Sequence, residues 1–177
     1  MPNQVLSRSG GSLLLYHGTA ESFEAFDSKH VGSRHADIIR EDGLDETVDP
    51  TAFYFTNDPN TAVWYAKSSA TQAGKPEGEG VVMTVTLTMK KPLKVDFMGE
   101  GREYLAEEIE KAKAEGCDGV ICIDYDDGGV SDHYIVFNPS QVTILSTQIC
   151  AEFEKTVEPE SDDESEDEED NFEQQRG

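Results

Sequence analysis

Four side chains that could do chemistry lie in three stretches where an apolar run meets a turn or a helix: His17, Tyr54, Tyr65 and His133. An imidazole donates or accepts hydrogen bonds near neutral pH, and a tyrosine offers a flat aromatic face. Taken singly, each residue also fits a structural role, as a strand end, a core aromatic or part of a buried helix face. Their joint occurrence in one short chain favours a shared binding or catalytic site. The stretches are LLLYHGT at 13–19, AFYFTNDPNTAVWYA at 52–66 and SDHYIVFNPSQVTIL at 131–145.

The patterns around these residues predict the elements that hold them. LLLYHGT is a short apolar run that ends in a glycine turn, which indicates a buried strand. FYFT at 53–56 is aromatic and favours a second strand. Asp58 suits the N-cap and Pro59 the first position of a helix, so a helix is expected to carry Tyr65. Trp64 is interpreted as a packing residue at the edge of that helix.

The rest of the chain predicts further strands and one more long helix. That helix, at 101–116, is closed by Gly116 and places Glu107 and Lys111 at a favourable i, i+4 spacing. Pro139 interrupts the last apolar run, and the residues after this proline are expected to form an edge strand or a new segment. The remaining predicted elements are strands at 81–89, 92–97, 118–124 and 132–145, with the last broken at 138–139, and a short helix near His35–Arg40.

Charge divides the chain into a body and a tail. The 177 residues carry a formal net charge of −23. Residues 152–173 hold thirteen acids and one base, Lys155, which gives −12 and leaves −11 for the remainder. Such a tail cannot bury enough apolar surface to fold by itself. We therefore expect a flexible N-terminus at 1–11, one domain at 12–150 and a disordered acidic tail at 151–177, which is either a solvated extension or an arm that binds a basic partner.

The composition excludes several classes of site. Cys117, Cys122 and Cys150 show no CxxC spacing, and their odd number favours a reducing compartment. No stretch is long and apolar enough to span a bilayer. We expect a monomeric, cytoplasmic protein. His30 and His35 have no third ligand at a suitable spacing, so no metal is expected. The glycines do not form GxGxxG after a strand, so no Rossmann fingerprint is present. An acidic body disfavours nucleic acid and favours a basic protein partner.

The three stretches, in this order, resemble the motifs of ADP-ribosyltransferases of the diphtheria-toxin and poly-ADP-ribose-polymerase type. They are most similar to the small versions in phage and bacterial polyvalent proteins, over residues 13–145. The resemblance implies an α+β fold, with a split antiparallel sheet, flanking helices and NAD bound in the cleft between the two halves.

The resemblance also implies a role for each residue. His17 would hydrogen-bond a ribose hydroxyl of NAD, and the backbone of Gly18 would pair with the nicotinamide carboxamide, which a residue without a side chain permits. Thr19 stands where the family has Ser or Thr. Tyr54 and Tyr65 would stack on the two sides of the nicotinamide, whose positive charge favours aromatic faces.

The third motif departs from the family pattern. His133 stands where the polymerising members carry Glu, with Asp132 before it and Tyr134 after it. A neutral histidine gives a hydrogen bond but no fixed negative charge to stabilise the oxocarbenium-like transition state. Asp132 should point to the opposite face, because adjacent strand residues alternate. The loop acids at 124, 126 and 127 could also approach the site.

The resemblance therefore predicts mono-ADP-ribosyl transfer from NAD to a macromolecule, a protein in preference to nucleic acid, with release of nicotinamide. The missing Glu leaves a second hypothesis open: a non-catalytic module that binds NAD or ADP-ribose, or docks a protein beside an acidic arm. An RNA 2′-phosphotransferase-like activity ranks last, because only 14 Lys and Arg are available to hold RNA phosphate.

Overall fold

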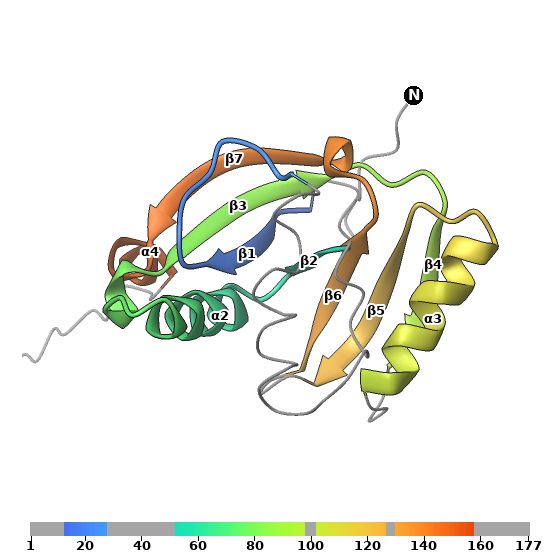
Figure 1. Cartoon of the computed structure of the whole chain (residues 1–177), viewed down its shortest axis with the longest axis horizontal. Coiled ribbons are helices and arrows are strands. Elements are labelled where there is room, and N and C mark those ends of the chain that lie inside the picture. The colour runs from blue at the N-terminus through green and yellow to red at the C-terminus, as the bar shows by residue number, and fades with distance from the viewer. Residues whose placement is uncertain (1–12, 28–51, 98–101, 127–129, 158–177) are drawn as a thin grey trace, which may run out of the picture.

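The protein folds around a single seven-stranded sheet with helices on one side (Figure 1). The computed structural model describes residues 13–27, 52–97, 102–126 and 130–157. The strands are β1 (Leu15–Thr19), β2 (Phe53–Thr56), β3 (Val81–Leu87), β4 (Pro92–Asp96), β5 (Gly119–Asp126), β6 (Val130–Val136) and β7 (Val142–Ile149). The helices are α2 (Pro59–Gln72), α3 (Arg102–Ala114) and α4 (Cys150–Val157), with short 3₁₀ turns η1 (Glu77–Glu79) and η2 (Pro139–Gln141).

The sheet divides into two halves between β1 and β2. Its strand order is β4-β5-β6-β2-β1-β3-β7. β1 pairs with β3 over five residues, but it meets β2 only at Tyr16 opposite Thr56. The two halves therefore diverge at this point, as Figure 1 shows. The predicted α+β class is confirmed, with one refinement: β4 runs parallel to β5, so the sheet is mixed, although all its other neighbours are antiparallel.

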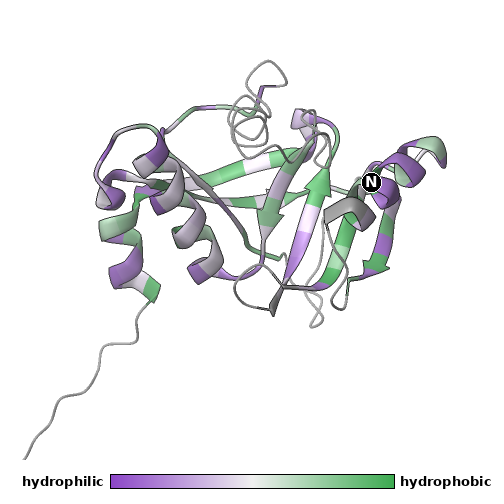
Figure 2. Ribbon diagram, turned by 60° about the horizontal axis from the view of Figure 1, so that its bottom comes forward, coloured by the Kyte–Doolittle hydropathy of each residue, from purple (hydrophilic) through white to green (hydrophobic). Residues whose placement is uncertain are grey.

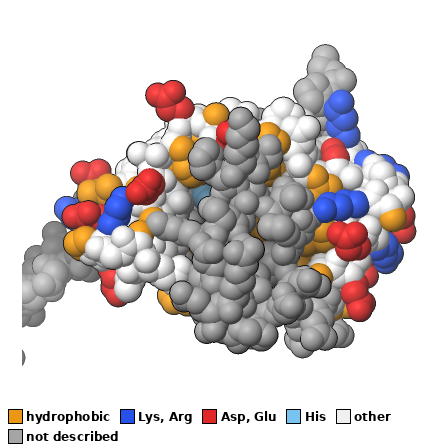
Figure 3. All heavy atoms as spheres, viewed as in Figure 1, with side chains coloured by type: hydrophobic (Ala, Val, Ile, Leu, Met, Phe, Trp, Pro, Cys, Tyr) orange, Lys and Arg blue, Asp and Glu red, His pale blue; other side chains and the backbone are white. Residues whose placement is uncertain are grey.

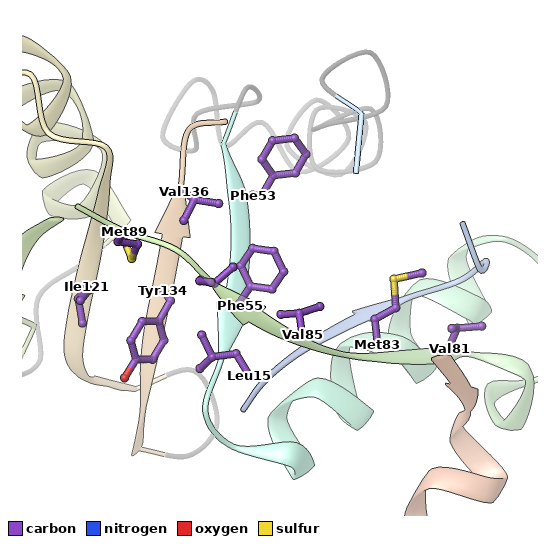
Figure 4. Close-up of a cluster of buried hydrophobic side chains, with 11 residues drawn as sticks. Leu15, Phe53, Phe55, Val81, Met83, Val85, Met89, Ile121, Tyr134 and Val136 are labelled. Atoms are coloured by element: carbon purple, nitrogen blue, oxygen red, sulfur yellow. The ribbon is translucent and has the colours of Figure 1, made fainter. Parts of the chain in front are cut away.

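Side-chain alternation gives the sheet two different faces. One face carries Leu15, Phe55 and Tyr134, which meet residues of β3 and β5 in the largest apolar cluster (Figure 4). Phe23 and Phe26, from the segment that follows β1, pack against this cluster. We call this face the aromatic face. Figure 2 shows how apolar positions concentrate along the strands while the helices keep polar outer sides.

The opposite face, called here the helical face, carries the three helices. A cluster that includes Ile109 of α3 and Ile135 of β6 fills the space under α3. A second cluster joins Ala62 and Ala66 of α2 to Val82 of β3 and to α4. Helix α2 packs mainly on β1 and β3 and also touches β2, and β6 follows β2 in the sheet.

Helix α2 begins where the sequence predicts. Asp58 accepts hydrogen bonds from the backbone nitrogens of Asn60 and Thr61, and Pro59 occupies the first turn. Trp64 departs from the prediction: it is 57% exposed and makes an edge contact with the Tyr65 ring, 5.1 Å between centroids. Its position on α2 turns it away from the sheet, so it does not act as a core residue.

The turn between β6 and β7 explains the predicted break at proline. The Asn138 side chain accepts from Ser140 N, and Gln141 Oε1 accepts from Asn138 N, which forms a reciprocal capping box around η2. The Gln141 amide also donates to the carbonyls of Thr88 and Asp118. β7 is therefore a new strand at the edge of the sheet, as expected after Pro139.

The predicted ion pair on helix α3 needs correction, whereas its predicted end is confirmed. Lys111 pairs with Glu108 at 3.2 Å, one position from the expected Glu107, because i, i+3 neighbours also lie side by side and Glu108 is the better buried partner. Gly116 does close the segment, with a positive φ of 68°.

The predicted domain end at residue 150 is also too early. Residues 150–157 form α4, which packs Phe153 into the core, with its ring 5.7 Å from that of Tyr16. Glu154 accepts a 2.5 Å hydrogen bond from Lys67 of α2. The many acidic residues after position 150 indicated a disordered tail, although Cys150 and Phe153 give this short helix an apolar face. The helix predicted near residues 35–40 lies outside the described residues, and in the described part of the chain no helix is long and apolar enough to cross a membrane.

The Asp58 cap gives a first prediction. Asp58→Ala should lower the free energy of unfolding by about 1 kcal/mol, because two backbone N–H groups and the Thr61 hydroxyl lose their acceptor. Asp58→Asn keeps an acceptor and should recover most of the loss. Urea unfolding of the two variants and of the exposed neighbour change Asn60→Ala measures the effect. Equal stability of Asp58→Ala and wild type would show that the cap is energetically unimportant.

Candidate active site

His17 lies at the point where the two halves of the sheet part. Its Nδ1 donates to the backbone carbonyl of Tyr54 over 2.9 Å, which bridges β1 and β2 beyond their single residue pair. The ring packs against Phe26 and Phe55, with centroids 5.2 and 5.6 Å apart. Because a carbonyl only accepts, Nδ1 carries the hydrogen, and in the neutral ring Nε2 is an acceptor. This polarity suits a hydroxyl donor such as that of a ribose.

Gly18 is in direct contact with helix α2. A Cβ atom at this position would lie 2.1 Å from Ala62 O, 2.5 Å from Ala66 N and 2.9 Å from Tyr65 Cβ. No side chain fits in this space, so the packing of α2 on β1 already requires glycine here. This reason is independent of the predicted approach of nicotinamide to the Gly18 backbone, and composition alone did not reveal it.

Tyr54 and Tyr65 both come close to Gly18 on the helical face. Continuing the register of Tyr16 and Thr56 places Gly18 across from Tyr54 at the point where the strands separate. The contact of Gly18 with Tyr65 Cβ places the second tyrosine beside the same residue. Tyr54 and Tyr65 are each half-buried. Gly18 and Tyr65 are thus in contact, and Tyr54 lies on the same face of the neighbouring strand, where it packs against the cluster under α3, whereas the ring of His17 lies on the aromatic face.

Thr19 ends β1, where it pairs with Val81 and is half-buried. By strand alternation its side chain lies on the same side as that of His17, away from Gly18. A role for Thr19 would therefore accompany that of His17 and not the tyrosine pair.

His133 lies on the helical face of β6, two positions before the residue opposite Tyr54, and inside the protein. It is opposite Thr56 of β2 and Cys122 of β5, and only 7% of its surface is exposed. The ring of Tyr125 lies 4.4 Å away, tilted by 36°. Burial lowers the pKa of His133 to about 4, against smaller opposing effects of Asp132 and Asp58. The imidazole is neutral at pH 7 and supplies no fixed charge to the site.

Two residues that the sequence analysis overlooked set the environment of His133. Ser131 Oγ lies 3.1 Å from His133 Nε2 and accepts from Thr56 Oγ1 over 3.3 Å. Thr56 and Ser131 are 3% and 6% exposed. Both stand two positions from a residue already singled out, Thr56 after Tyr54 and Ser131 before His133. Period-two spacing on a strand was the signal that could have found them.

The acids near His133 occupy a bulge between β5 and β6. The register shifts between Cys122 and Tyr125, and Asp124 takes a φ of 56°. Asp132 Oδ1 accepts from Asp124 N, and Asn57 exchanges two hydrogen bonds with the Asp132 backbone. The Asp132 carboxylate is thus used to hold the bulge.

Two further loop acids and a cysteine belong to this region. The side chain of Asp126 and the whole of Asp127 lie outside the described part of the chain. Burial raises the pKa of the Cys122 thiol to about 12, so it is no nucleophile. Within the described residues no three His, Cys, Asp or Glu side chains gather as metal ligands, and His30 and His35 are outside them.

Comparison with known proteins identifies the family. The family model described as ADP-ribosyltransferase in polyvalent proteins matches residues 8–149. The chain belongs to this family. The predicted resemblance is confirmed, and the family gives the reaction class, ADP-ribosyl transfer with NAD as the substrate.

A solved structure shares the fold. The crystal structure of the M. tuberculosis MbcT–MbcA toxin–antitoxin complex contains a chain that aligns with a TM-score of 0.50 and 14% identity, over 80% of this chain and 87% of that one. At this identity the likeness concerns the fold alone. Among the curated proteins compared, none matches the chain.

The Gly18 contact gives a second prediction. Gly18→Ala should destabilise this ADP-ribosyltransferase domain by about 2 kcal/mol or more, because α2 must move away from β1 to admit the methyl group. Gly78→Ala is the matched control, since its Cβ would meet nothing closer than 3.8 Å. Urea unfolding measures both. A Gly18→Ala variant as stable as Gly78→Ala would contradict the close contact.

The burial of His133 gives a third prediction, on pH. The ring titrates near 6.5 when unfolded and near 4 when folded, so the unfolded state binds more protons between these values. This contribution to stability is complete above pH 6.5 and is lost as the pH falls to 4, by up to about 3 kcal/mol. Unfolding free energies of wild type and His133→Gln from pH 7 to 4.5 measure it. The variant should lose less stability over this range, and parallel curves would contradict the burial.

Proposed function

We propose that the protein is a mono-ADP-ribosyltransferase that moves ADP-ribose from NAD to a protein and releases nicotinamide. The proposal is supported by the contact of Gly18 with Tyr65 beside the split of the sheet, and by the register that puts Tyr54 and His133 on the same face. In this arrangement the nicotinamide lies between the two tyrosines, and the carboxamide pairs with the Gly18 backbone. The His17 ring, oriented by the Tyr54 carbonyl, accepts from a ribose hydroxyl.

The reaction needs little covalent chemistry from the protein. The bond between ribose C1′ and the nicotinamide nitrogen breaks, and its electron pair leaves with nicotinamide, which becomes neutral. A nucleophile of the target forms the new bond to C1′ and gives its proton to solvent. The tyrosines hold the leaving group, since two aromatic faces favour the cationic ring before it departs.

The neutral ring of His133 limits what the site does. A carboxylate at this position would stabilise the positive charge that develops on the ribose, and losing such a group costs a few kcal/mol of transition-state stabilisation. Chain elongation needs this group to activate a ribose hydroxyl, so we infer a single transfer. A target that brings its own carboxylate would offset part of the missing charge.

The charge distribution supports a basic protein as the target. The described cations next to α2, Lys67 and Lys75, are paired with Glu154 and Glu21. Of the other described lysines, Lys155 lies on α4, and the rest gather at the far end of the sheet, on or next to β4 and α3 (Figure 3). The segment around His17 carries acids, such as the exposed Glu24. A basic surface would approach this side of the molecule with favourable electrostatics.

A second candidate function is the binding of NAD or ADP-ribose without reaction. The observation that favours it is the enclosure of His133 between Tyr125 and Ser131, with 7% of its surface exposed. Under this alternative the tyrosines and His17 would hold the dinucleotide, and the acidic arm would recruit a partner.

Label transfer from biotinylated NAD tests the proposal. Wild type should label proteins in a bacterial lysate and release nicotinamide, and Tyr54→Ala and Tyr65→Ala should each lower the rate at least tenfold, because the leaving group loses an aromatic face. Tyr104→Ala is the matched control, a half-buried tyrosine of α3 that packs on Phe97 at 5.6 Å, far along the sheet.

The outcomes separate the candidates. Release of nicotinamide without labelled macromolecules would indicate an NAD glycohydrolase. NAD binding by calorimetry without nicotinamide release would support the binding module. Equal loss in all three variants would mean that reduced stability, and not the site, explains the effect.

A further inference from the structure

A chain of hydrogen bonds connects the start of helix α2 to the ring of His133. Asp58 N lies 3.1 Å from Thr56 Oγ1, Thr56 Oγ1 lies 3.3 Å from Ser131 Oγ, and Ser131 Oγ lies 3.1 Å from His133 Nε2. The three side chains are less than 8% exposed. The chain thus runs from the helix that carries Tyr65 to the third-motif position through the protein interior.

The donors and acceptors of this chain favour one direction for its hydrogen bonds, from Asp58 toward His133. A backbone N–H only donates, so Thr56 Oγ1 accepts from Asp58 and uses its own hydrogen toward Ser131. Ser131 Oγ then accepts from Thr56 and keeps one hydroxyl hydrogen to donate, and His133 Nε2 lies within hydrogen-bond distance of it. If that hydrogen goes to Nε2, the neutral ring carries its own hydrogen at Nδ1.

We propose that Thr56 and Ser131 are positioning residues that fix His133 as a neutral Nδ1–H tautomer, so that the third motif presents a hydrogen-bond donor to the nicotinamide ribose. The catalytic consequence rests on the proposed function, whereas the tautomer does not. Where the family's Glu would accept from a ribose hydroxyl, His133 donates to the oxygen of that hydroxyl. The hydroxyl is oriented without being deprotonated, which fits single transfer.

The local packing explains why this direction is stable. The Tyr125 ring at 4.4 Å and the cross-strand neighbour Cys122 leave the imidazole in an apolar setting, where a second ring hydrogen would create a buried charge. A doubly protonated ring would also donate at Nε2, to the Ser131 oxygen. The Ser131 hydroxyl would then need a new acceptor, so protonation would disrupt the chain as well as desolvate a charge.

The tautomer is measured by ¹⁵N–¹H correlation spectra of the histidine rings at pH 7.5, with the signals of His133 assigned from their loss in His133→Gln. In wild type, Nδ1 should show the shift of a protonated nitrogen and Nε2 that of an acceptor. Ser131→Ala removes the hydroxyl and should move the population toward Nε2–H. Thr56→Val should give a smaller shift in the same direction, and Ser131→Thr, which keeps the hydroxyl, should resemble wild type.

Nicotinamide release from NAD by the same variants measures the catalytic consequence. Ser131→Ala should lower kcat about tenfold with KM little changed, and Ser131→Thr should retain most of the rate, while circular dichroism shows that each variant is folded. An unchanged tautomer in both Ser131→Ala and Thr56→Val would overturn the inference whatever the rates. A changed tautomer with an unchanged kcat would overturn its catalytic part.

Failure of the proposed function gives a distinct result. No nicotinamide release by wild type, together with the expected change of tautomer, would contradict the transferase and leave the donor polarity of His133 supported.

Discussion

The contact between Gly18 and helix α2 is the constraint on which the site depends. Backbone atoms of Ala62 and Ala66 approach Gly18 so closely that a methyl group has no room. The chain reverses direction at the Asp58 N-cap directly after β2, and the helix then packs against β1 at a fixed distance from Gly18. The contact also holds Tyr65 beside Gly18, at the edge of the split in the sheet.

The incomplete pairing of β1 and β2 opens the sheet next to this contact. A fully paired β1 and β2 would bring their backbones together along their whole length, but only Tyr16 and Thr56 are paired. His17 spans the gap with a side chain where a regular sheet would use a backbone bond. Because that bond uses Nδ1, the bridge also orients the ring. The aromatic rings of Phe26 and Phe55 pack against the same imidazole and help to hold it in place.

Local sequence patterns predicted the helices and strands, whereas exposure and packing depend on contacts between residues distant in the sequence. The period-two alternation of β3, the Asp58–Pro59 start of α2 and the break at Pro139 depend on neighbours in sequence, so they could be predicted. The exposure of Trp64 and the packing of Phe153 depend on which face meets the sheet, so they could not. Motif resemblance named candidate site residues but not the reason for Gly18. Period-two spacing puts Thr56 on the face of Tyr54 and Ser131 on the face of His133, but not their mutual contact, because the two are 75 positions apart in the sequence.

Histidine in place of glutamate at the third motif changes the surroundings that this position requires. A carboxylate there must be kept charged, which requires solvent or donors around it, whereas a neutral imidazole is stable in an apolar setting. Tyr125 and Cys122 provide such a setting, and Ser131 provides the one polar partner that a neutral ring needs at Nε2. The surroundings are therefore matched to histidine, and a carboxylate placed among them would lack donors for its second oxygen. This match implies that the residue and its neighbours form a unit, in which a change at one position alters what the others must bind.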